Sequence, residues 1–212
     1  MATGEQEQIE TETERKYDVD TGFVLPDLTG AGGSVSMAPP DVQLLEATYF
    51  DTDDLRLIGA RITLRRRTGG DDAGWHIKLP VGGDTRREVH FPLGPPGRVV
   101  PAQIAAELAR WSGGAPLRPV ARLETHRTVR RLIGESGEVL AEVADDRVTG
   151  SRPDPADPET WRLQDTWREV EVELKSGPPE LLDAAAAGLA AAGARPSRSA
   201  SKLARVLHRD PS

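Results

Sequence analysis

The chain has 212 residues, a net charge of −7 and no cysteine. The absence of cysteine excludes disulfide bonds, thiolate metal sites and a cysteine nucleophile. The negative net charge argues against general nucleic-acid binding. No apolar run approaches the roughly 20 residues that span a bilayer, and the N-terminus carries no signal pattern. We therefore expect a cytoplasmic protein with neither nucleic acid nor a membrane as partner.

In chain order, the polar residues 1–8 predict a flexible N-terminal tail ahead of one folded domain over residues 9–209. Period-two alternation bounded by turn residues then predicts strands. These are Ile9–Val19, Leu44–Asp51, Arg61–Thr68, Trp75–Leu79, Arg86–Leu93, Ala121–Ile133, Val139–Val148 and Trp161–Leu174. Helical spacing predicts helices at Ala102–Trp111, Pro179–Ala192 and Ser199–His208. The Pro-rich segment Arg152–Pro158 predicts a surface loop.

Three of the predicted strands carry charge along one whole face. The charged sets, whose members are two or four residues apart and therefore share a face, are Glu10, Glu12, Glu14, Lys16 and Asp18; Arg61, Arg65 and Arg67; and Glu169, Glu171 and Glu173. A solvated outer face would explain any one such strand. Like charges along one face repel one another, however, and the predicted helices need the apolar faces to cover.

Closing the sheet would turn these charged faces inward. A barrel of about eight strands has room for side chains and one small ligand. The sequence therefore predicts an α+β fold, a closed eight-stranded antiparallel β-barrel with helices packed on its outer face. Basic and acidic walls facing each other suit a metal-bound polyphosphate, because Arg and Lys bind phosphate oxygens and carboxylates hold Mg²⁺ or Mn²⁺.

Lysine is rare in this chain, which marks the few positions that keep it. Only four of the 27 basic residues are Lys, namely Lys16, Lys78, Lys175 and Lys202. A GC-rich genome explains the Arg bias but not these exceptions. Because Lys is a compact point charge and Arg a planar fork, a tight site distinguishes between them. The lysines are therefore candidate site residues, except Lys175, which follows the late Glu strand and is better explained as a surface residue.

A set of motifs in order along the chain resembles the CYTH superfamily, the triphosphate tunnel metalloenzymes. Glu12-Thr13-Glu14-Arg15-Lys16 matches the Glu-x-Glu-x-Lys signature of that family. Its companions are Tyr49-Phe50-Asp51-Thr52, Leu64-Arg65-Arg66-Arg67, Trp75-His76-Ile77-Lys78, Glu88, Arg127, Asp145-Asp146, Glu169-Val170-Glu171-Val172-Glu173 and Ser201-Lys202. The resemblance extends from about Glu10 to Arg209, and the set is far more specific than any one motif.

The resemblance implies roles for the matched residues. Catalytic and substrate-binding roles fall to Lys16, Arg65, Arg67 and Lys78, and further substrate-binding roles to Glu88, Arg127 and Lys202. Metal-binding roles fall to Glu12, Glu14, Asp145, Asp146, Glu169, Glu171 and Glu173, with Mg²⁺ or Mn²⁺ as the cofactor. Two choices stay open: which of Asp145 and Asp146 faces the tunnel, and which two of the three late Glu residues bind metal. None of the four His residues has the spacing of metal ligands, so each is given a structural or surface role.

The resemblance implies metal-dependent hydrolysis of a triphosphate, with inorganic tripolyphosphate as the first choice of substrate. Thiamine triphosphatase and class IV-type adenylate cyclase activities are alternatives within the family. A non-enzymatic polyphosphate-binding module is the alternative outside enzymes. Bacterial domains of this kind occur ahead of a helical, His-rich CHAD domain, so a CHAD domain beyond Ser212 is a candidate partner. The sequence leaves monomer and homodimer both open.

Overall fold

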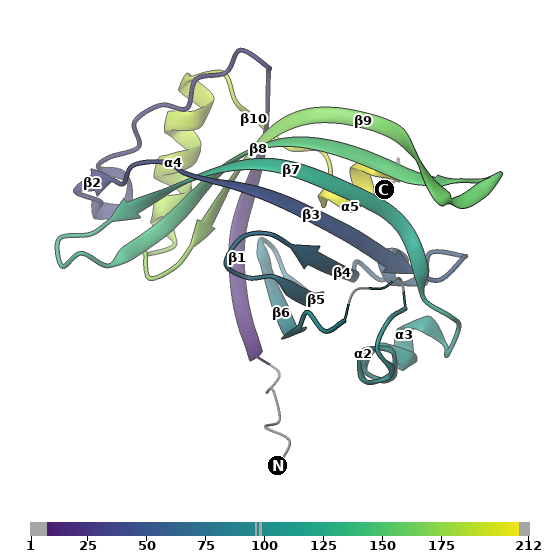
Figure 1. Ribbon diagram of the computed structural model, residues 1–212. Coiled ribbons are helices and arrows are strands. Elements are labelled where there is room, and N and C mark those ends of the chain that lie inside the picture. Colours follow the sequence, from purple (N-terminus) through teal and green to yellow (C-terminus); the bar gives the residue numbers. More distant parts are fainter. Residues whose placement is uncertain (1–7, 96, 98, 208–212) are drawn as a thin grey trace.

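The computed structural model describes residues 8–95, 97 and 99–207, which form one antiparallel sheet with short helices around it (Figure 1). The strands are β1 (Gln8–Val19), β2 (Ser36–Met37), β3 (Asp41–Asp51), β4 (Thr63–Thr68), β5 (Gly74–Gly82), β6 (Thr85–Pro92), β7 (Arg118–Ile133), β8 (Val139–Asp154), β9 (Asp157–Leu174) and β10 (Arg195–Pro196). The helices are α1 (Arg56–Gly59), α2 (Ala102–Glu107), α3 (Ala109–Ser112), α4 (Glu180–Ala191), α5 (Lys202–Val206) and the 3-10 helix η1 (Ala31–Gly33).

Eight of the strands close into a ring in the order β1, β6, β5, β4, β3, β7, β8, β9, and every neighbouring pair is antiparallel. β1 closes the ring with its two halves, because Gln8–Thr13 pair with β6 and Glu14–Val19 pair with β9. This change of neighbour midway along β1 makes the ring less regular than an ideal barrel. The predicted α+β class and closed antiparallel ring of eight strands are confirmed.

Two apolar clusters cover the outside of the ring. α4 packs on the outer face of β1, β8 and β9, where Leu181, Leu182, Ala185 and Leu189 are buried with Tyr17, Val19, Val143, Val170 and Val172. On the other side, α1, α2 and α3 cover β4, β5 and β6 through Leu57, Ile104, Leu108, Leu64, Trp75, Ile77 and Val89. The outward side chains alternate with the charged ones, so burying the apolar face leaves the charged face inside the ring.

The last helix, α5, packs against the inner wall of the ring rather than on its outer face, which corrects the predicted placement of the helices. Leu203, Val206 and Leu207 form a buried cluster with Tyr49, Leu123, Val148 and Trp167. Figure 1 shows α5 beneath the arch of β7, β8 and β9. Gly150 permits this approach, because a Cβ there would lie 2.4 Å from Cγ2 of Val206. An apolar plug therefore fills one part of the ring and leaves the charged cavity beside it.

The motif Tyr49-Phe50-Asp51-Thr52 has a structural role at the end of β3. The fully buried carboxylate of Asp51 accepts hydrogen bonds from the backbone N–H groups of Thr52, Leu57 and Ile58, at 2.7, 2.9 and 3.0 Å. The Thr52 hydroxyl accepts a bond from the N–H of Arg56 at 3.0 Å. These bonds satisfy the free amides at the start of α1 and fix how it turns back toward β4.

Several predicted boundaries were wrong, and four of the errors change the description of an element. The strand predicted from Arg61 begins at Thr63, because Arg61 has a φ of 61°, which does not fit a strand. Arg152–Pro158 is not a loop, since β8 and β9 continue to pair up to Asp154 and Asp157. The helix predicted over residues 102–111 is divided at Leu108 into α2 and α3. α5 begins at Lys202, with Ser201 as its N-cap, and ends at Val206.

Part of the predicted domain layout lies outside the described residues. Of the predicted tail, only Gln8 is described, and it begins β1. His208 and Arg209, at the predicted end of the domain, are not among the described residues. None of the helices in the described part of the chain combines the length and apolar character needed to cross a membrane.

Candidate functional site

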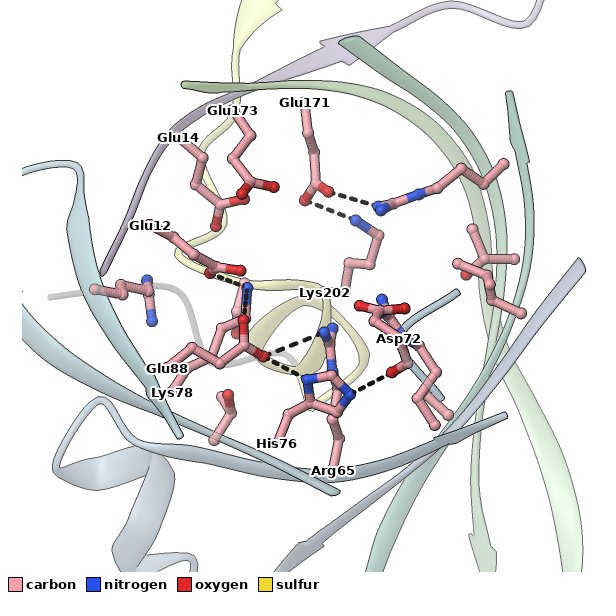
Figure 2. A pocket seen from close by; sticks show the side chains of 18 of the residues that line it. Glu12, Glu14, Arg65, Asp72, His76, Lys78, Glu88, Glu171, Glu173 and Lys202 are labelled. Carbon is pink, nitrogen blue, oxygen red and sulfur yellow. Dashed lines mark hydrogen bonds and ion pairs between the residues drawn. The ribbon is translucent and has the colours of Figure 1, made fainter. Parts of the chain in front are cut away.

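The inner face of the ring encloses a cavity of about 380 Å³ that contains most of the charged residues predicted for the site (Figure 2). Strand alternation places them there: β1 contributes Glu12, Glu14 and Lys16, while the next residue, Tyr17, points outward into the α4 cluster. The lining contains nine basic and nine acidic side chains among the described residues. The empty cavity is therefore close to electroneutral and is not simply a basic pocket.

One wall is built by β4, β5 and β6 and contains Arg65, Lys78 and Glu88. Lys78 donates a hydrogen bond to Glu12 and forms an ion pair with Glu88 at 3.6 Å. Arg65 lies 3.5 Å from Glu88. Cross-strand pairing of Lys78 with Glu88 and of Arg65 with His76 sets these side chains on the same inner face. The wall therefore alternates cations and carboxylates on neighbouring strands, which stabilises both in a partly dehydrated site.

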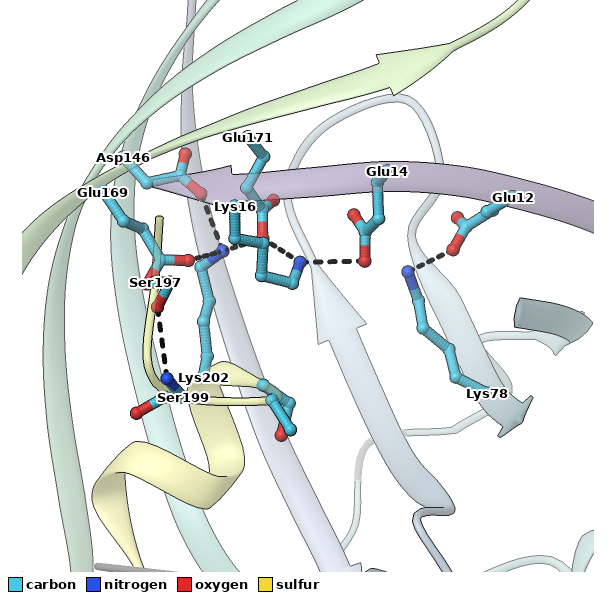
Figure 3. Close-up of polar contacts among 12 residues, drawn as sticks. Glu12, Glu14, Lys16, Lys78, Asp146, Glu169, Glu171, Ser197, Ser199 and Lys202 are labelled. Atoms are coloured by element: carbon cyan, nitrogen blue, oxygen red, sulfur yellow. Dashed lines mark hydrogen bonds and ion pairs between the residues drawn. The ribbon is translucent and has the colours of Figure 1, made fainter. Parts of the chain in front are cut away.

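The opposite wall, from β7, β8 and β9, holds the deepest charges. Arg127 donates two hydrogen bonds to Asp146, at 2.8 and 2.7 Å, and a third to Glu171 at 2.7 Å. The side chain of Lys202 extends from the start of α5 and contacts three carboxylates (Figure 3). Its Nζ lies 3.0 Å from Asp146, 2.6 Å from Glu169 and 2.7 Å from Glu171. Lys16 joins the same network through Glu171 and through Glu14 at 2.8 Å.

The network around Glu171 keeps its members charged. Burial acts to raise the pKa of Glu171, but the ammonium groups of Lys16 and Lys202 outweigh it and hold this pKa well below the usual range. The pKa of Asp146 is lowered in the same way, by Lys202 and Arg127 against the effect of burial. Conversely, these carboxylates overcome burial and raise the pKa of Lys202. At neutral pH this wall is an array of paired ions.

The wall near Glu12 behaves differently. Burial, with the nearby carboxyl of Glu88, raises the pKa of Glu12 to about 8 although Lys78 opposes the change. The pKa of Glu88 is shifted well below its usual range because His76 and Lys78 outweigh its burial. Burial lowers the pKa of His76 to about 3. In the empty cavity at neutral pH, Glu12 is therefore largely protonated, Glu88 is ionised and His76 is neutral.

Two arginines have hydrogen-bonding capacity that the described residues do not use. The Nε atoms of Arg65 and Arg67 are buried and lack a hydrogen-bond partner among the described residues. Burial, reinforced by the positive charges of Arg65 and Arg127, lowers the pKa of Arg67 to about 9. A buried donor without a partner and a cation beside other cations are both costly. An anion placed between these guanidinium groups would relieve both costs.

The acidic residues offer an oxygen-only donor set. Asp146, Glu169 and Glu171 each place a carboxylate oxygen within 4.8 Å of the others, and Glu12 and Glu14 of β1 line the same cavity as Glu171. Carboxylate oxygens without His or Cys are the ligands of hard divalent cations such as Mg²⁺ and Mn²⁺. The residues therefore fit a metal of this class, although Lys202 occupies the centre of the triad.

The structure brings together nearly all of the residues that the sequence singled out. The catalytic and substrate-binding candidates and the acidic residues of β1 surround the cavity, as do Glu171 and Glu173 of β9. Asp146 and Glu169 are not part of the cavity lining but form ion pairs with Lys202, which is. Asp145 is the exception, because it lies on the other face of β8 and forms a bidentate pair with Arg168 at 2.7 and 2.8 Å. The geometry favours Asp146 over Asp145 as the residue that faces the cavity.

Sequence reasoning missed or underrated several contributors to the lining, among them His76, Asp72 and Lys175. His76 was given a structural or surface role, yet it lines the cavity with Nδ1 2.6 Å from Glu88. Its spacing of two from Lys78 was the available signal. Asp72 enters from the β4–β5 loop and forms an ion pair with Arg67, which no periodicity indicates. Lys175 contacts Glu173 at 2.6 Å, lines the cavity and has a 38% exposed side chain, so it is a residue of the cavity rim.

Comparison with known proteins agrees with this arrangement. The model of the CYTH domain family matches residues 10–207. The chain belongs to the CYTH domain family. It is 42% identical over 204 residues to two uncharacterized proteins of Mycobacterium tuberculosis, MT2285 and Rv2226; the match covers 92% of this chain and 40% of each relative. The CYTH chain thus spans about 40% of the length of these relatives.

Solved structures share the fold at low sequence identity. A candidate adenylate cyclase from Bacillus halodurans superposes with a TM-score of 0.60 at 17% identity, over 93% of this CYTH chain and 97% of that protein. A candidate adenylyl cyclase from Hippeastrum, described as having a dominant triphosphatase activity, gives a TM-score of 0.55 at 15% identity, over 95% and 97% of the two chains. At this identity the likeness establishes the fold alone.

Proposed function

We propose that this CYTH domain hydrolyses inorganic tripolyphosphate with the help of a divalent metal ion. The observation that carries the proposal is the enclosed cavity in which Lys16, Arg65, Arg67, Lys78 and Arg127 face carboxylates. Cations on several strands can contact successive phosphoryl groups, because the oxygens of a linear polyphosphate are spread along its length. The unpartnered Nε atoms of Arg65 and Arg67 support an anion at that wall.

A metal requirement follows from the charge balance of the lining. Nine acidic side chains offset the nine basic ones, so a polyanion that bound alone would leave the cavity strongly negative. Divalent cations held by Glu12, Glu14, Glu171 and Glu169 would restore neutrality. When bound, such a metal polarises phosphoryl oxygens and makes water a better nucleophile at neutral pH.

The residues of the chain would contribute position and charge rather than a covalent nucleophile. Arg65 and Arg67 would hold the phosphoryl group that is transferred, and Lys78 would neutralise charge that develops on it. Arg127 is already fixed by Asp146 and Glu171, so it would meet the ligand without reorganising. Lys16 would contact the ligand from β1. Such fixed charges lower the barrier because they need no reorientation during the reaction.

The lining favours an inorganic chain over a nucleotide or thiamine triphosphate. Apart from Tyr49, His76 and His90, it contains no aromatic side chain among the described residues. α5 fills the neighbouring part of the ring with an apolar plug, which removes space for an organic group. Thiamine triphosphatase and adenylate cyclase activities remain alternatives, and the latter has support from the named activity of the structural neighbours.

One observation favours a second function, the binding of polyphosphate without turnover. Lys202 fills the centre of the Asp146, Glu169 and Glu171 triad and neutralises carboxylates that a metal would need. If Lys202 stays there when the ligand binds, the domain would retain a polyanion without activating water at this wall. Binding and hydrolysis must therefore be measured separately.

One experiment separates these functions. Phosphate release is measured from tripolyphosphate, thiamine triphosphate and ATP, first with Mg²⁺ and then with Mn²⁺, and cyclic AMP is measured in the ATP samples. We expect metal-dependent release from tripolyphosphate with a higher kcat/KM than from the other two. Tight binding of tripolyphosphate in calorimetry with no release would establish the binding module instead. Cyclic AMP as the main product from ATP would establish a cyclase.

A further inference from the structure

The loop between β4 and β5 bends over the cavity and brings a carboxylate into it. Gly69 and Gly70 make the turn, with φ values of 80° and 71°. A Cβ on Gly69 would lie 2.0 Å from the carbonyl oxygen of Leu44, so the loop is pressed against β3 at this point. The next two residues, Asp71 and Asp72, both line the cavity. Figure 2 shows Asp72 among the side chains that project into it.

The side chain of Asp72 forms an ion pair with Arg67. Among the described residues, Asp72 is the one carboxylate within ion-pair distance of this guanidinium. The two partners differ in exposure, since the side chain of Arg67 is 7% exposed and that of Asp72 is 52% exposed. The cation is therefore fixed in the wall, whereas the carboxylate arrives from the solvent side.

In the ion pair of Asp72 with Arg67 the carboxylate belongs to a loop, whereas in the ion pairs of Arg127 and Lys202 the carboxylates belong to strands. Arg127 and Lys202 are held by carboxylates of β8 and β9, whose backbone is fixed by strand pairing. Asp72 belongs to a loop outside the ladder of β4 and β5, whose pairing ends with Arg67 and Gly74. Its carboxylate can leave Arg67 while all strand pairing is kept.

The backbone of the same loop is tied to the cavity by His76. Nε2 of His76 lies 2.9 Å from the carbonyl oxygen of Asp72, and its Nδ1 lies 2.6 Å from Glu88. The ring also stacks on His90, with 4.4 Å between ring centroids. His76 thus anchors the loop backbone beside Arg67 and keeps the side chain of Asp72 within reach of it.

We propose that Asp72 takes the place of a phosphoryl group on Arg67 when the cavity is empty, and that a polyphosphate must displace it in order to bind. Asp72 is then a residue that weakens anion binding at Arg67. The competition weakens every anion that needs Arg67 by the same factor, so a ligand with a single weak anionic group loses detectable binding first, whereas a polyanion held by several other cations still binds. The inference rests on the proposed function for its ligand, but the ion pair itself does not depend on it.

The size of the effect follows from a competition between two anions for one site. When the binding-competent state is only fractionally populated, the apparent dissociation constant is the intrinsic value divided by that fraction. Since Asp72 is half exposed, the pair has the modest strength of a surface ion pair, which leaves the competent state at roughly 10–20%. Removing the carboxylate should therefore tighten tripolyphosphate binding by about five- to tenfold.

The test compares Asp72→Asn with Asp71→Asn. Both variants remove one negative charge from neighbouring cavity residues, but only Asp72 pairs with Arg67. Dissociation constants for tripolyphosphate are measured by calorimetry without metal, so that no turnover occurs. We expect the five- to tenfold gain for Asp72→Asn and a change within about twofold for Asp71→Asn. In an Arg67→Gln background, the effect of Asp72→Asn should disappear.

The outcomes distinguish failure of this inference from failure of the proposed function. If the unmodified chain binds tripolyphosphate and Asp72→Asn tightens binding no more than Asp71→Asn, the displacement model is overturned while the proposed function stands. If the unmodified chain neither binds nor hydrolyses tripolyphosphate but Asp72→Asn binds it, the displacement model holds and hydrolysis fails. Absence of binding in all variants overturns both.

Discussion

Replacing Lys202 by Met tests whether the buried carboxylates depend on this ammonium. Met keeps most of the length and apolar stem of the side chain but removes the charge. The side chains of Asp146, Glu169 and Glu171 around it are 0%, 4% and 10% exposed. Removing one partner of a buried ion pair costs about 3–5 kcal/mol, because it leaves a buried charge uncompensated. Arg127 and Lys16 still compensate part of it, so we expect the free energy of unfolding to fall by about 3 kcal/mol.

The measurement is urea denaturation at pH 7, with Lys175→Met as the matched control. Lys175 also pairs with a Glu of β9, at 2.6 Å, but its side chain is 38% exposed, so its removal should cost less than about 1 kcal/mol. Because Lys202 holds the pKa of Asp146 and Glu171 down, its stabilising effect is complete above the usual carboxylate range and is lost as the pH falls from that range through the lowered pKa values. Equal costs for the two variants, or a cost for Lys202→Met that does not shrink in acid, would refute this reasoning.

Four further predictions concern the site and the fold. Arg65→Ala and Lys78→Ala should each lower kcat/KM for tripolyphosphate by about 30- to 1,000-fold, equivalent to about 2–4 kcal/mol of transition-state stabilisation. The control Arg66→Ala, on the outer face of β4, should change kcat/KM less than about threefold. Full rates in both site variants would rule out the proposed cavity chemistry. Because the pKa of Glu12 is about 8 in the empty cavity, Mn²⁺ binding at pH 7 should release a proton, and the affinity for Mn²⁺ should increase as the pH rises toward 8. Calorimetry in buffers of different ionisation enthalpy should show this proton release. The Glu12→Gln variant should show none. The same shift means that folding stability from Glu12 is full below pH 4.5 and declines as the pH rises to about 8, so Glu12→Gln should flatten that part of the pH–stability curve. Asp51→Ala should lower the free energy of unfolding by about 2–4 kcal/mol, since it leaves two buried N–H groups and one partly buried N–H group without a partner. The control Asp53→Ala removes an exposed ion pair and should cost less than about 0.5 kcal/mol.

Strand alternation made the ring predictable from the sequence. On β1, every second position carries a carboxylate or ammonium group, and the apolar residues Tyr17 and Val19 occupy the alternate positions. Only one arrangement satisfies both sets, with the ions inside the ring and the apolar residues under α4. The same parity assigns Arg65 and Arg67 to the cavity and Arg66 to the outer face. Parity also separates Asp146 from Asp145, but only once the register of β8 against β7 and β9 is known.

Contacts between segments far apart in the chain were not predictable in this way. The position of α5 depends on the space that Gly150 leaves on the inner wall, and a Gly at that position gives no helical or strand signal by itself. Asp72 sits in a turn, where side-chain direction follows from the φ values of Gly69 and Gly70 rather than from any period. Both features result from tertiary packing, which local patterns do not encode.

The balance of charges in the cavity explains how the ring stays folded when empty and what a ligand must do. Lys78 is paired with Glu88, Lys16 with Glu14, and Lys202 with the triad, so each buried ammonium has a carboxylate partner before any ligand arrives. A polyanion that takes the ammonium groups frees the carboxylates, and a divalent cation that takes the carboxylates frees the ammonium groups. Each ligand thus removes the competitor of the other, and their binding must be positively coupled by the same factor in either order. A cavity with only basic walls would bind polyphosphate without metal. In a cavity whose cations are already paired with carboxylates, a metal that binds those carboxylates makes the cations available to the polyphosphate, so the metal is part of the recognition.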